Sequence, residues 1–307
     1  MRSIAVLLVL AVVLGIPMPA SAAPASSPLL WLRADAGVQS TSSKVYQWDD
    51  QSGNGKHATM TVDARKPTLV SGALNGLPVI RFGGAQSLNL LNPASPTAFT
   101  VFIVGKNSKA TETFSMILGP GGSFPNNQLR WENGSQALFV GTGNNLPVIT
   151  STIGNTRVYH VLSARYDGSV LKVYRNGNPL SSHSFTTSGP WTLSNVGAWY
   201  STYFMTGDLA EVLIYSRALT ETERSQTNTY LGTKYGLPYG TSCPNGLCEP
   251  GFGESCSTCT WDCSPCPTCD YDSVCDLDED STCSDCCGGP ALQTDGDFVV
   301  QPCEPIS

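Results

Sequence analysis

Short runs of apolar or alternating residues, separated by turn residues, fill the chain from residue 29 to residue 216, and this pattern constrains the fold most. No long stretch in this region shows the 3.6-residue period of an amphipathic helix. The runs are residues 29–34, 77–82, 99–106, 114–119, 136–141, 158–166, 170–177 and 208–216. Many short strands with regular turn signals predict an all-β sandwich or barrel.

Two dipeptides typical of turns predict how three of these strands connect. Asp167-Gly168 and Asn176-Gly177 bracket the apolar run 170–175. Both dipeptides suit hairpin turns, which require positive φ. A three-strand meander from about residue 158 to residue 185 is therefore expected.

One helix is predicted after the last strand. Thr220 and Glu223 have the spacing of a capping box, in which each side chain bonds the other residue's backbone amide. Leu231 and Tyr235 mark the packing face, and Gly236 marks the end. We expect a short helix that packs beside the last strand.

The cysteines and charges divide the chain. All 12 cysteines lie between Cys243 and Cys303, and residues 241–307 hold 13 acidic and no basic residues. The cysteine spacing repeats, since gaps of four, seven and two residues are followed by gaps of five, seven and two. So polar a segment cannot fold on an apolar core alone. We predict a separate acidic, Cys-rich domain at residues 241–307.

Two kinds of site could use these cysteines. Pairs of the form C-x-x-C could hold zinc, but an even number of cysteines in an exported, core-poor repeat favours disulfides. The cysteines expected in disulfides, with unassigned pairing, are Cys243, Cys248, Cys256, Cys259, Cys263, Cys266, Cys269, Cys275, Cys283, Cys286, Cys287 and Cys303.

The first 22 residues have the features of a secretory signal peptide. Arg2 precedes an apolar run at residues 4–15, and small residues end at Ala22. We expect residues 1–22 to be cleaved and residues 23–240 to form the main domain. The product would be secreted, extracellular or periplasmic, with no membrane insertion after cleavage. No dense basic stripe marks a nucleic-acid partner.

Several stretches resemble a known group of domains. Residues 29–38, 46–59, 65–88, 173–177 and 207–237 resemble the laminin-G-like, concanavalin A-like lectin/glucanase jelly rolls of secreted prokaryotic proteins. The resemblance covers about residues 28–238. It implies a two-sheet antiparallel jelly-roll sandwich with one short C-terminal helix, followed by a small disulfide-rich tail dominated by loops. Members usually read F-D-G where this chain has Phe82-Gly83-Gly84, which removes a carboxylate.

The tail resembles a second group, the short repeats appended to many extracellular prokaryotic proteins. Their form is C-x-N-G-x-C-E-x-G-E-x-C-x-x-C-x-x-D-C, matched here from Cys243 to Cys263.

The fold by itself does not determine function, because such jelly rolls serve many roles. We expect a secreted or cell-surface binding or adhesion module for glycans or extracellular proteins, or else a non-catalytic structural surface or matrix protein. Exposed aromatic rings can stack on sugars, although about half of such rings fill the core. The ligand-binding candidates are Trp131, Glu132, Asn133, Trp199, Tyr200 and Tyr203; the tryptophans assigned to the core are Trp31, Trp48 and Trp191.

An enzyme is not expected from the motifs. The E-x-D-x-x-E motif of jelly-roll glucanases and the G-x-S-x-G motif of serine hydrolases are both missing. Asp208 and Glu211 are three residues apart, which puts them on opposite faces of a regular strand. A glycoside-active enzyme is therefore the disfavoured alternative.

The stretch WDDQSGNG, residues 48–55, resembles the first half of a calcium loop. Its twelfth position, counted from Asp50, is Thr61 instead of the bidentate carboxylate that such a loop needs. A tight turn is the favoured interpretation, with glycines supplying permissive backbone and Asn54 tolerating positive φ. No cofactor is required, and calcium is the one ion considered. Its candidate ligands are Asp49, Asp50, Ser52, Asn54, Asp63 and Asp208.

Overall fold

A computed structural model describes residues 23–109, 114–120, 128–132, 137–141, 149–152, 156–184, 186, 190–199, 203–237, 291–292 and 298–299. The predicted signal peptide and all 12 cysteines lie outside these residues. Within the tail, the short strands β18 (Ala291–Leu292) and β19 (Phe298–Val299) form an antiparallel pair. No described helix is both long and apolar enough to cross a bilayer.

Antiparallel strands make up most of the main domain. They are β1 (Leu30–Arg33), β2 (Val38–Thr41), β3 (Lys44–Trp48), β4 (Ala58–Thr59), β5 (Thr68–Leu74), β6 (Leu77–Gly83), β7 (Leu88–Ala94), β8 (Phe99–Asn107), β9 (Phe114–Gly119), β10 (Gln128–Glu132), β11 (Ala137–Gly141), β12 (Ile149–Thr152), β13 (His160–Tyr166), β14 (Val170–Arg175), β15 (Asn178–Ser184), β16 (Leu193–Val196) and β17 (Thr206–Tyr215). A 3-10 turn, η1 (Asp63–Arg65), and one helix, α1 (Glu221–Tyr235), complete it.

The strand pairings form two sheets. In the first, β15, β14, β13, β8 and β17 are successive neighbours, and the far edge of β17 pairs with β6 along its first half and with β1 along its second. In the second, the order is β12, β11, β10, β9, β16, β7, β4, β3 and β2. The sheets connect where β5, which pairs with β6, also meets β3. The predicted all-β jelly-roll sandwich is confirmed.

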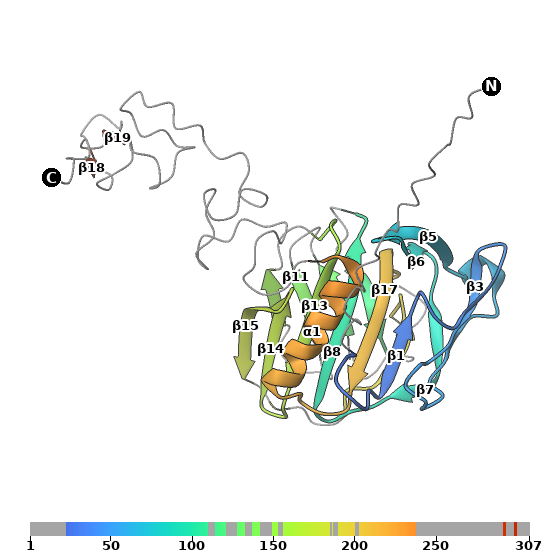
Figure 1. Ribbon diagram of the computed structural model, residues 1–307, viewed down its shortest axis with the longest axis horizontal. Coiled ribbons are helices and arrows are strands. Elements are labelled where there is room, and N and C mark those ends of the chain that lie inside the picture. The colour runs from blue at the N-terminus through green and yellow to red at the C-terminus, as the bar shows by residue number, and fades with distance from the viewer. Residues whose placement is uncertain are drawn as a thin grey trace, which may run out of the picture.

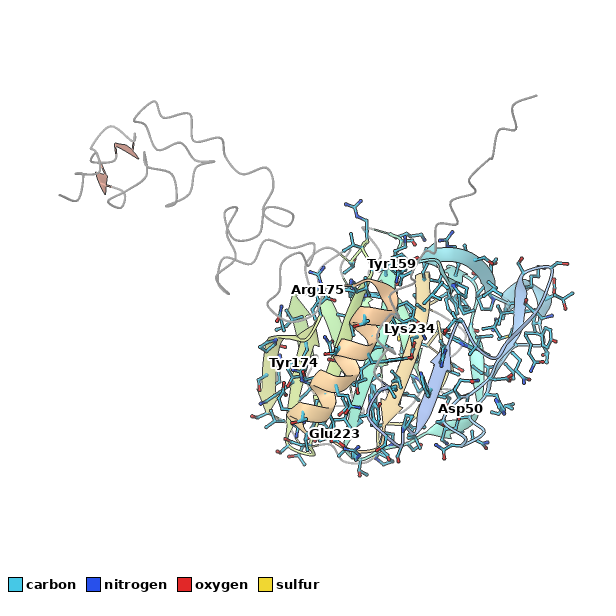
Figure 2. The ribbon with its side chains drawn as sticks, viewed as in Figure 1. Asp50, Tyr159, Tyr174, Arg175, Glu223 and Lys234 are labelled. Atoms are coloured by element: carbon cyan, nitrogen blue, oxygen red, sulfur yellow. The ribbon has the colours of Figure 1, made fainter. Side chains whose placement is uncertain are left out.

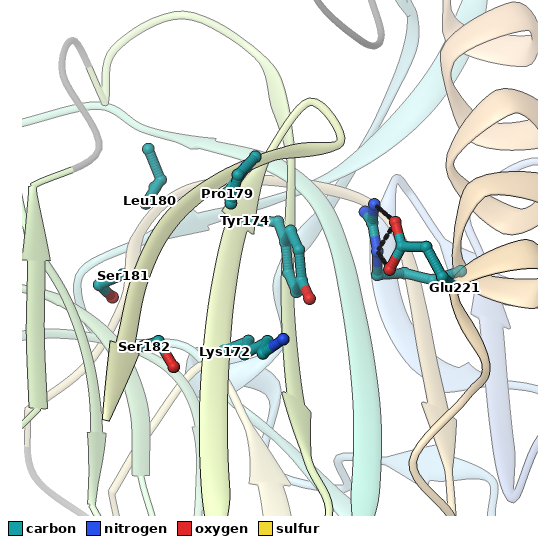
Figure 3. Close-up of a pocket in the computed structure, with 8 residues that line it drawn as sticks. Lys172, Tyr174, Pro179, Leu180, Ser181, Ser182 and Glu221 are labelled. Atoms are coloured by element: carbon teal, nitrogen blue, oxygen red, sulfur yellow. Dashed lines mark hydrogen bonds and ion pairs between the residues drawn. The ribbon is translucent and has the colours of Figure 1, made fainter. Parts of the chain in front are cut away.

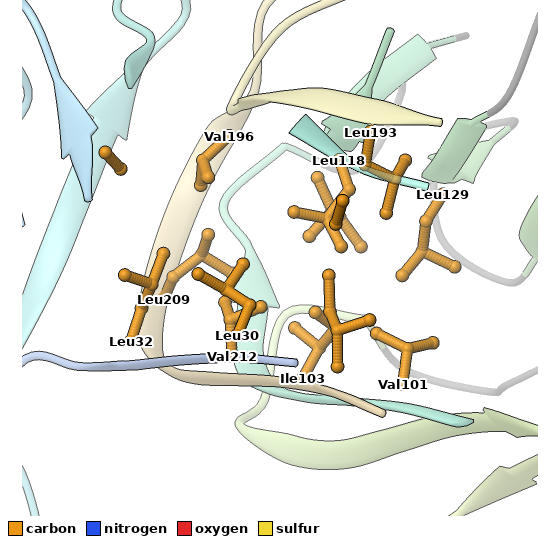
Figure 4. Packing of buried hydrophobic residues seen from close by; sticks show 14 of the residues in the cluster. Leu30, Leu32, Val101, Ile103, Leu118, Leu129, Leu193, Val196, Leu209 and Val212 are labelled. Carbon is orange, nitrogen blue, oxygen red and sulfur yellow. The ribbon is translucent and has the colours of Figure 1, made fainter. Parts of the chain in front are cut away.

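The main core lies between the two sheets. Leu30, Ile103 and Val212 of the first sheet pack toward Leu118 and Val196 of the second (Figure 4). Burial of such aliphatic side chains contributes roughly 1.5–3 kcal/mol each, so this layer supplies most of the driving force for folding.

Large aromatic rings fill the same core. Trp48 and Trp191 are fully buried there, as expected, and Trp191 stacks on Phe99 with ring centroids 4.1 Å apart. Trp31 differs from the expectation. It is only half-buried, because it lies on the opposite face of the first sheet, beside α1.

The predicted meander is confirmed as β13, β14 and β15 (Figure 1). Asn176 and Gly177 both have positive φ, as a two-residue hairpin turn requires. The Asn176 side chain also accepts a hydrogen bond from the amide of Val161, which fastens the turn to β13. Gly168, in the preceding turn, has φ +102°.

The predicted helix is also confirmed, and it covers the outer face of the first sheet (Figure 1). The capping box of Thr220 and Glu223 is complete, and Gly236 ends the helix in the left-handed conformation. Leu231 and Tyr235 pack on that outer face, in a second buried cluster with Phe102 of β8.

A buried carboxylate fixes α1 to the sheet. Glu211 of β17 is fully buried and accepts hydrogen bonds from Trp31 Nε1 (2.5 Å), Lys234 Nζ (2.7 Å), Tyr235 OH (2.8 Å) and Tyr230 OH (3.1 Å). Burial, followed by the charge of Glu211, raises the pKa of both Tyr230 and Tyr235, so both phenols remain donors at neutral pH. Lys234 projects from α1 toward β17 (Figure 2), so one ion pair links helix and sheet.

The WDDQSGNG stretch forms a turn, as predicted. Asp50 Oδ1 accepts from the amides of Trp31 (3.0 Å) and Ser52 (2.9 Å), and Oδ2 accepts from the amide of Lys56 (2.9 Å) and the hydroxyl of Ser52 (2.8 Å). Gly53 and Gly55 have φ of +86° and +67°. The turn thereby ties β1 to the segment after β3.

The expected role of Asn54 is wrong. Its φ is not among the positive values in this turn. Instead, its side-chain amide donates to the carbonyl oxygens of Pro28 and Leu29, both at 3.1 Å. Asn54 thus fastens the turn to the start of β1 through its side chain.

Replacing Lys234 tests the contribution of the buried pair. We expect Lys234→Met to lower the free energy of unfolding by about 3–5 kcal/mol, because Glu211 would be left buried without its cation. Denaturant unfolding of the full chain measures this. Lys44→Met, which removes an exposed lysine on β3, serves as control and should change little. A loss for Lys234→Met no larger than that of the control contradicts the role assigned to the pair.

Replacing Asp50 tests the turn. Asp50→Ala removes four accepted hydrogen bonds and should lower the free energy of unfolding at pH 7 by about 3 kcal/mol. Asp63→Ala, at an exposed carboxylate, is the matched control and should leave the unfolding midpoint nearly unchanged.

The same substitution predicts a pH dependence. Burial raises the pKa of Asp50, but hydrogen bonds from Ser52, Trp31 and Lys56 outweigh it and hold the pKa below the ordinary value. A carboxyl with a lowered folded-state pKa stabilises the fold above its unfolded pKa of about 3.9, and this contribution disappears as pH falls through the folded-state pKa. The wild-type advantage over Asp50→Ala should therefore shrink below about pH 4. A constant difference from pH 7 to pH 2 would contradict this.

Candidate functional site

Strand β17 carries two fully buried carboxylates, Asp208 and Glu211. Leu209 pairs with Gly105 of the antiparallel strand β8, and Glu211 pairs with Val104, the residue directly before Gly105. Two steps along β17 thus match one step along β8, so Ala210 is an extra residue in a β-bulge. Leu209 and Val212 face the core between the sheets, while Ala210 and Leu213 face the cluster under α1.

The bulge overturns the expectation that these carboxylates lie on opposite faces. Asp208 bonds Tyr159, which packs against the cluster under α1, and Glu211 bonds Tyr230 and Tyr235 of α1. Both acids therefore lie on the outer face of the first sheet. A spacing of three residues places side chains on one face when an inserted residue shifts the alternation.

Asp208 is held by cations and a phenol. Arg81 donates to its two oxygens at 2.7 and 2.9 Å, Tyr159 OH donates at 2.6 Å, and Lys106 Nζ lies 3.8 Å away. Burial raises the pKa of Asp208, but the bonds from Arg81 and Tyr159 outweigh it and hold the pKa below its usual value. Asp208 is thus an ionised anchor for β6, β8 and the residue that precedes β13.

The candidate calcium ligands are not brought together as a set. Asp49 accepts from Gln39 and Gln47, Asp63 pairs with Lys44 and Lys66, and Asp208 lies beside Arg81. Within the described parts of the chain, no three His, Cys, Asp or Glu side chains gather in a metal-binding arrangement. A calcium site at Asp50, Ser52 and Asn54 stays a prediction.

An aromatic surface lies at the loop between β16 and β17. Trp199 and Tyr203 stack with ring centroids 5.2 Å apart and an interplanar angle of 19°. Tyr203 is 45% exposed. The guanidinium of Arg65, in η1, lies over the ring of the next residue, Phe204, at 5.7 Å. We call Trp199, Tyr203, Phe204 and Arg65 the aromatic surface.

The backbone beside the aromatic surface has a strained residue, and hydrogen bonds fix the segment next to it. Tyr203 has φ +49°, which a bulky residue rarely adopts. The neighbouring Met205 donates its amide to the carbonyl of Gly197 and accepts from the amide of Gly84 at the end of β6. Such strain persists only where the surroundings enforce it, and it occurs often at functional sites.

None of the other predicted ligand-binding residues is found at the aromatic surface among the described residues. Trp131 is fully buried in the core between the sheets, so its place on a ligand surface is a wrong expectation. The reason is alternation along β10, which turns Leu129 and Trp131 toward the same core. Tyr200 and Asn133 lie outside the described residues, as does the side chain of Glu132.

Sequence reasoning missed Arg65 at this surface. No local pattern marks it, because it meets Phe204 only through the packing of η1 against the loop before β17. The run of aromatics at residues 199–204 was the signal that located the rest.

Comparison with a family model identifies part of the chain. Residues 82–223 match the model of the concanavalin A-like lectin/glucanases superfamily. No curated protein gave a match.

Several solved structures are similar to this chain. Domain 4 of AbnA, a GH43 extracellular arabinanase from Geobacillus stearothermophilus, in complex with arabinotriose, is 18% identical with a TM-score of 0.50, over 67% of this chain and 99% of that one. Trypanosoma rangeli sialidase is 14% identical with a TM-score of 0.48, over 69% of this chain and 34% of that one. A GH54 α-L-arabinofuranosidase is 12% identical with a TM-score of 0.49, over 62% and 51%. At 18% identity, the likeness to domain 4 of AbnA shows the fold alone.

These comparisons correct one expectation. The chain was expected not to be an enzyme, yet the solved domain that shares its fold, domain 4 of AbnA, belongs to a GH43 arabinanase. A missing E-x-D-x-x-E motif is therefore no ground for excluding glycoside chemistry. Residues 82–223 are thus similar to the concanavalin A-like lectin/glucanases superfamily.

Proposed function

We propose that this chain is an extracellular glycan-binding protein that holds its ligand on the aromatic surface. The observation that carries the proposal is the stacked pair of Trp199 and Tyr203, with Tyr203 exposed in a left-handed conformation. Sugar rings present apolar C–H faces that pack on aromatic rings, and hydrogen-bonding groups at the edge can take the hydroxyls.

Arg65 adds hydrogen-bond donors to the aromatic surface. Arg65 lies over the ring of Phe204 with its guanidinium plane available to the cation–π contact. The guanidinium also carries several N–H donors, which can bond sugar hydroxyls at the rim. The surface thus combines aromatic faces with donors, which is the usual composition of a sugar site.

Arabinose oligosaccharides are the first ligands to test. Domain 4 of the G. stearothermophilus arabinanase shares the fold and is in complex with arabinotriose. We propose that this chain likewise binds a short oligosaccharide, as a domain associated with glycoside hydrolysis. The Cys-rich segment 241–307 would serve as a disulfide-stabilised spacer or docking element.

Removal of the exposed ring tests the proposal. Tyr203→Asn deletes the ring and keeps a residue that tolerates positive φ, so the backbone should stay in place. We expect its affinity for the bound oligosaccharide to fall about fivefold to tenfold, since an aromatic contact of this kind contributes about 1 kcal/mol or more. Calorimetric titration with a hit from a glycan array, headed by arabinotriose, measures the change.

The control is Tyr46→Asn, which removes another exposed tyrosine, on β3, whose ring meets Lys66 and is not one of the rings of the aromatic surface. It should bind as the wild type does. The array is run with calcium and again with chelator, because calcium-dependent binding would support the ion predicted at residues 50–54. If no sugar binds in either condition, the glycan proposal fails and a structural surface or matrix role replaces it.

Glycoside hydrolysis is the second candidate, and one observation favours it beyond the shared fold. The bulge at Ala210 puts Asp208 and Glu211 on one face of β17, and a pair of carboxylates on one face is what a glycosidase needs. Both are fully buried and bonded to cations, so we rank hydrolysis second. Release of reducing sugar from arabinan and sialoside substrates by the full chain tests it.

A further inference from the structure

A groove lies on the outer face of the first sheet, between the β14–β15 hairpin and the first turn of α1 (Figure 3). Its lining includes Lys172, Tyr174, Pro179, Ser182, Glu221 and Arg224. These side chains supply two cations, one carboxylate, two hydroxyl groups and an apolar wall. The groove shares no residue with the aromatic surface.

Arg224 forms one side of the groove and is fixed there. It is 6% exposed, its guanidinium lies 4.0 Å from the ring centroid of Tyr174, and its Nε donates to both oxygens of Glu221, at 3.1 and 3.0 Å. Arg224 and Glu221 therefore neutralise each other across the first turn of α1. The stacked guanidinium also holds the Tyr174 ring in position.

Lys172 and Tyr174 are the two groups left for a ligand. They alternate with inward-facing residues of β14, so both side chains point into the same groove (Figure 3). Within the part of the chain that the structure describes, Lys172 Nζ has no ion-pair partner and the Tyr174 hydroxyl has no hydrogen-bond partner. Burial raises the pKa of Tyr174, so its hydroxyl is a donor at neutral pH.

The charges around the groove favour an anion. Glu221 is paired with Arg224, and Asp167 is paired with Arg165 at 3.3 Å. The pKa of Glu221 is lowered, first by Arg224 and then by the charges of Lys172 and Arg165. Three cations thus face two carboxylates, and the N-terminal end of the 15-residue helix α1 adds a positive dipole end. The excess charge is positive and sits at Lys172.

We propose that this groove binds the carboxylate of an acidic sugar residue, such as a uronic acid. The Lys172 ammonium and the Tyr174 hydroxyl donate to the carboxylate oxygens. Ser182 is placed to bond a ring hydroxyl, and Pro179 packs on the sugar's apolar face. The inference rests on the proposed function only in taking the ligand to be a glycan.

The test compares an acidic trisaccharide with its neutral counterpart. The full chain is titrated with trigalacturonate and with its fully methyl-esterified form, which keeps the linkages and removes the charge, at about 50 and about 300 mM salt. We expect trigalacturonate to bind more tightly than the neutral sugar, with the difference reduced at high salt because screening weakens exposed charge contacts. Lys172→Gln should weaken trigalacturonate binding about tenfold, and Tyr174→Phe should weaken it about threefold to tenfold.

Two controls separate this site from the aromatic surface. Lys56→Gln, at a lysine outside the groove whose Nζ donates to the carbonyl of Pro93, should bind trigalacturonate as the wild type does. Tyr203→Asn should also retain it. If the wild type binds trigalacturonate but no neutral sugar, the aromatic surface alone is contradicted. Equal affinity of the wild type for both trisaccharides, or no change in Lys172→Gln, overturns the groove proposal.

Discussion

The buried carboxylate of Glu211 is the interaction on which the arrangement of the main domain depends. A charged group at this depth is unfavourable unless its oxygens are occupied, and here donors from β1 and from three residues of α1 occupy them. The helix therefore has one position on the sheet. That position in turn creates the groove between α1 and the β14–β15 hairpin, because the first turn of the helix supplies Arg224 and Glu221.

Much of this architecture was readable from local sequence. The turn at Asn176-Gly177, the capping box at Thr220 and the Asp50 turn each depend on residues close together in the chain, and all three are confirmed. The β-bulge at Ala210 was not readable, since its only signature is a shift in register between β17 and β8. The burial of Trp131 likewise follows from which face of β10 meets the core, and the aromatic run alone does not say so.

In the aromatic surface, too, some features follow from neighbouring residues in the sequence and others only from tertiary packing. A cluster of aromatics before β17 could be recognised from the sequence, whereas the stacking of Trp199 on Tyr203 became visible only in the structure. The contact between Arg65 and Phe204 required the fold, because it joins η1 to a loop far along the chain. Composition therefore located the candidate surface, while tertiary packing determined its cationic component.

In the Asp50 turn, oxygen atoms arranged as in the first half of a calcium loop stabilise the backbone of the turn. A carboxylate offers about four lone-pair sites, and Asp50 already accepts four hydrogen bonds, two on each oxygen. A calcium ion would have to displace amide donors from Trp31, Ser52 or Lys56 and leave part-buried N–H groups without acceptors, each at a cost of about 1–3 kcal/mol. It would also need further oxygens, since calcium takes six to eight. A calcium site here therefore requires the turn that joins β1 to β3 to rearrange, which couples any ion binding directly to the stability of the sandwich.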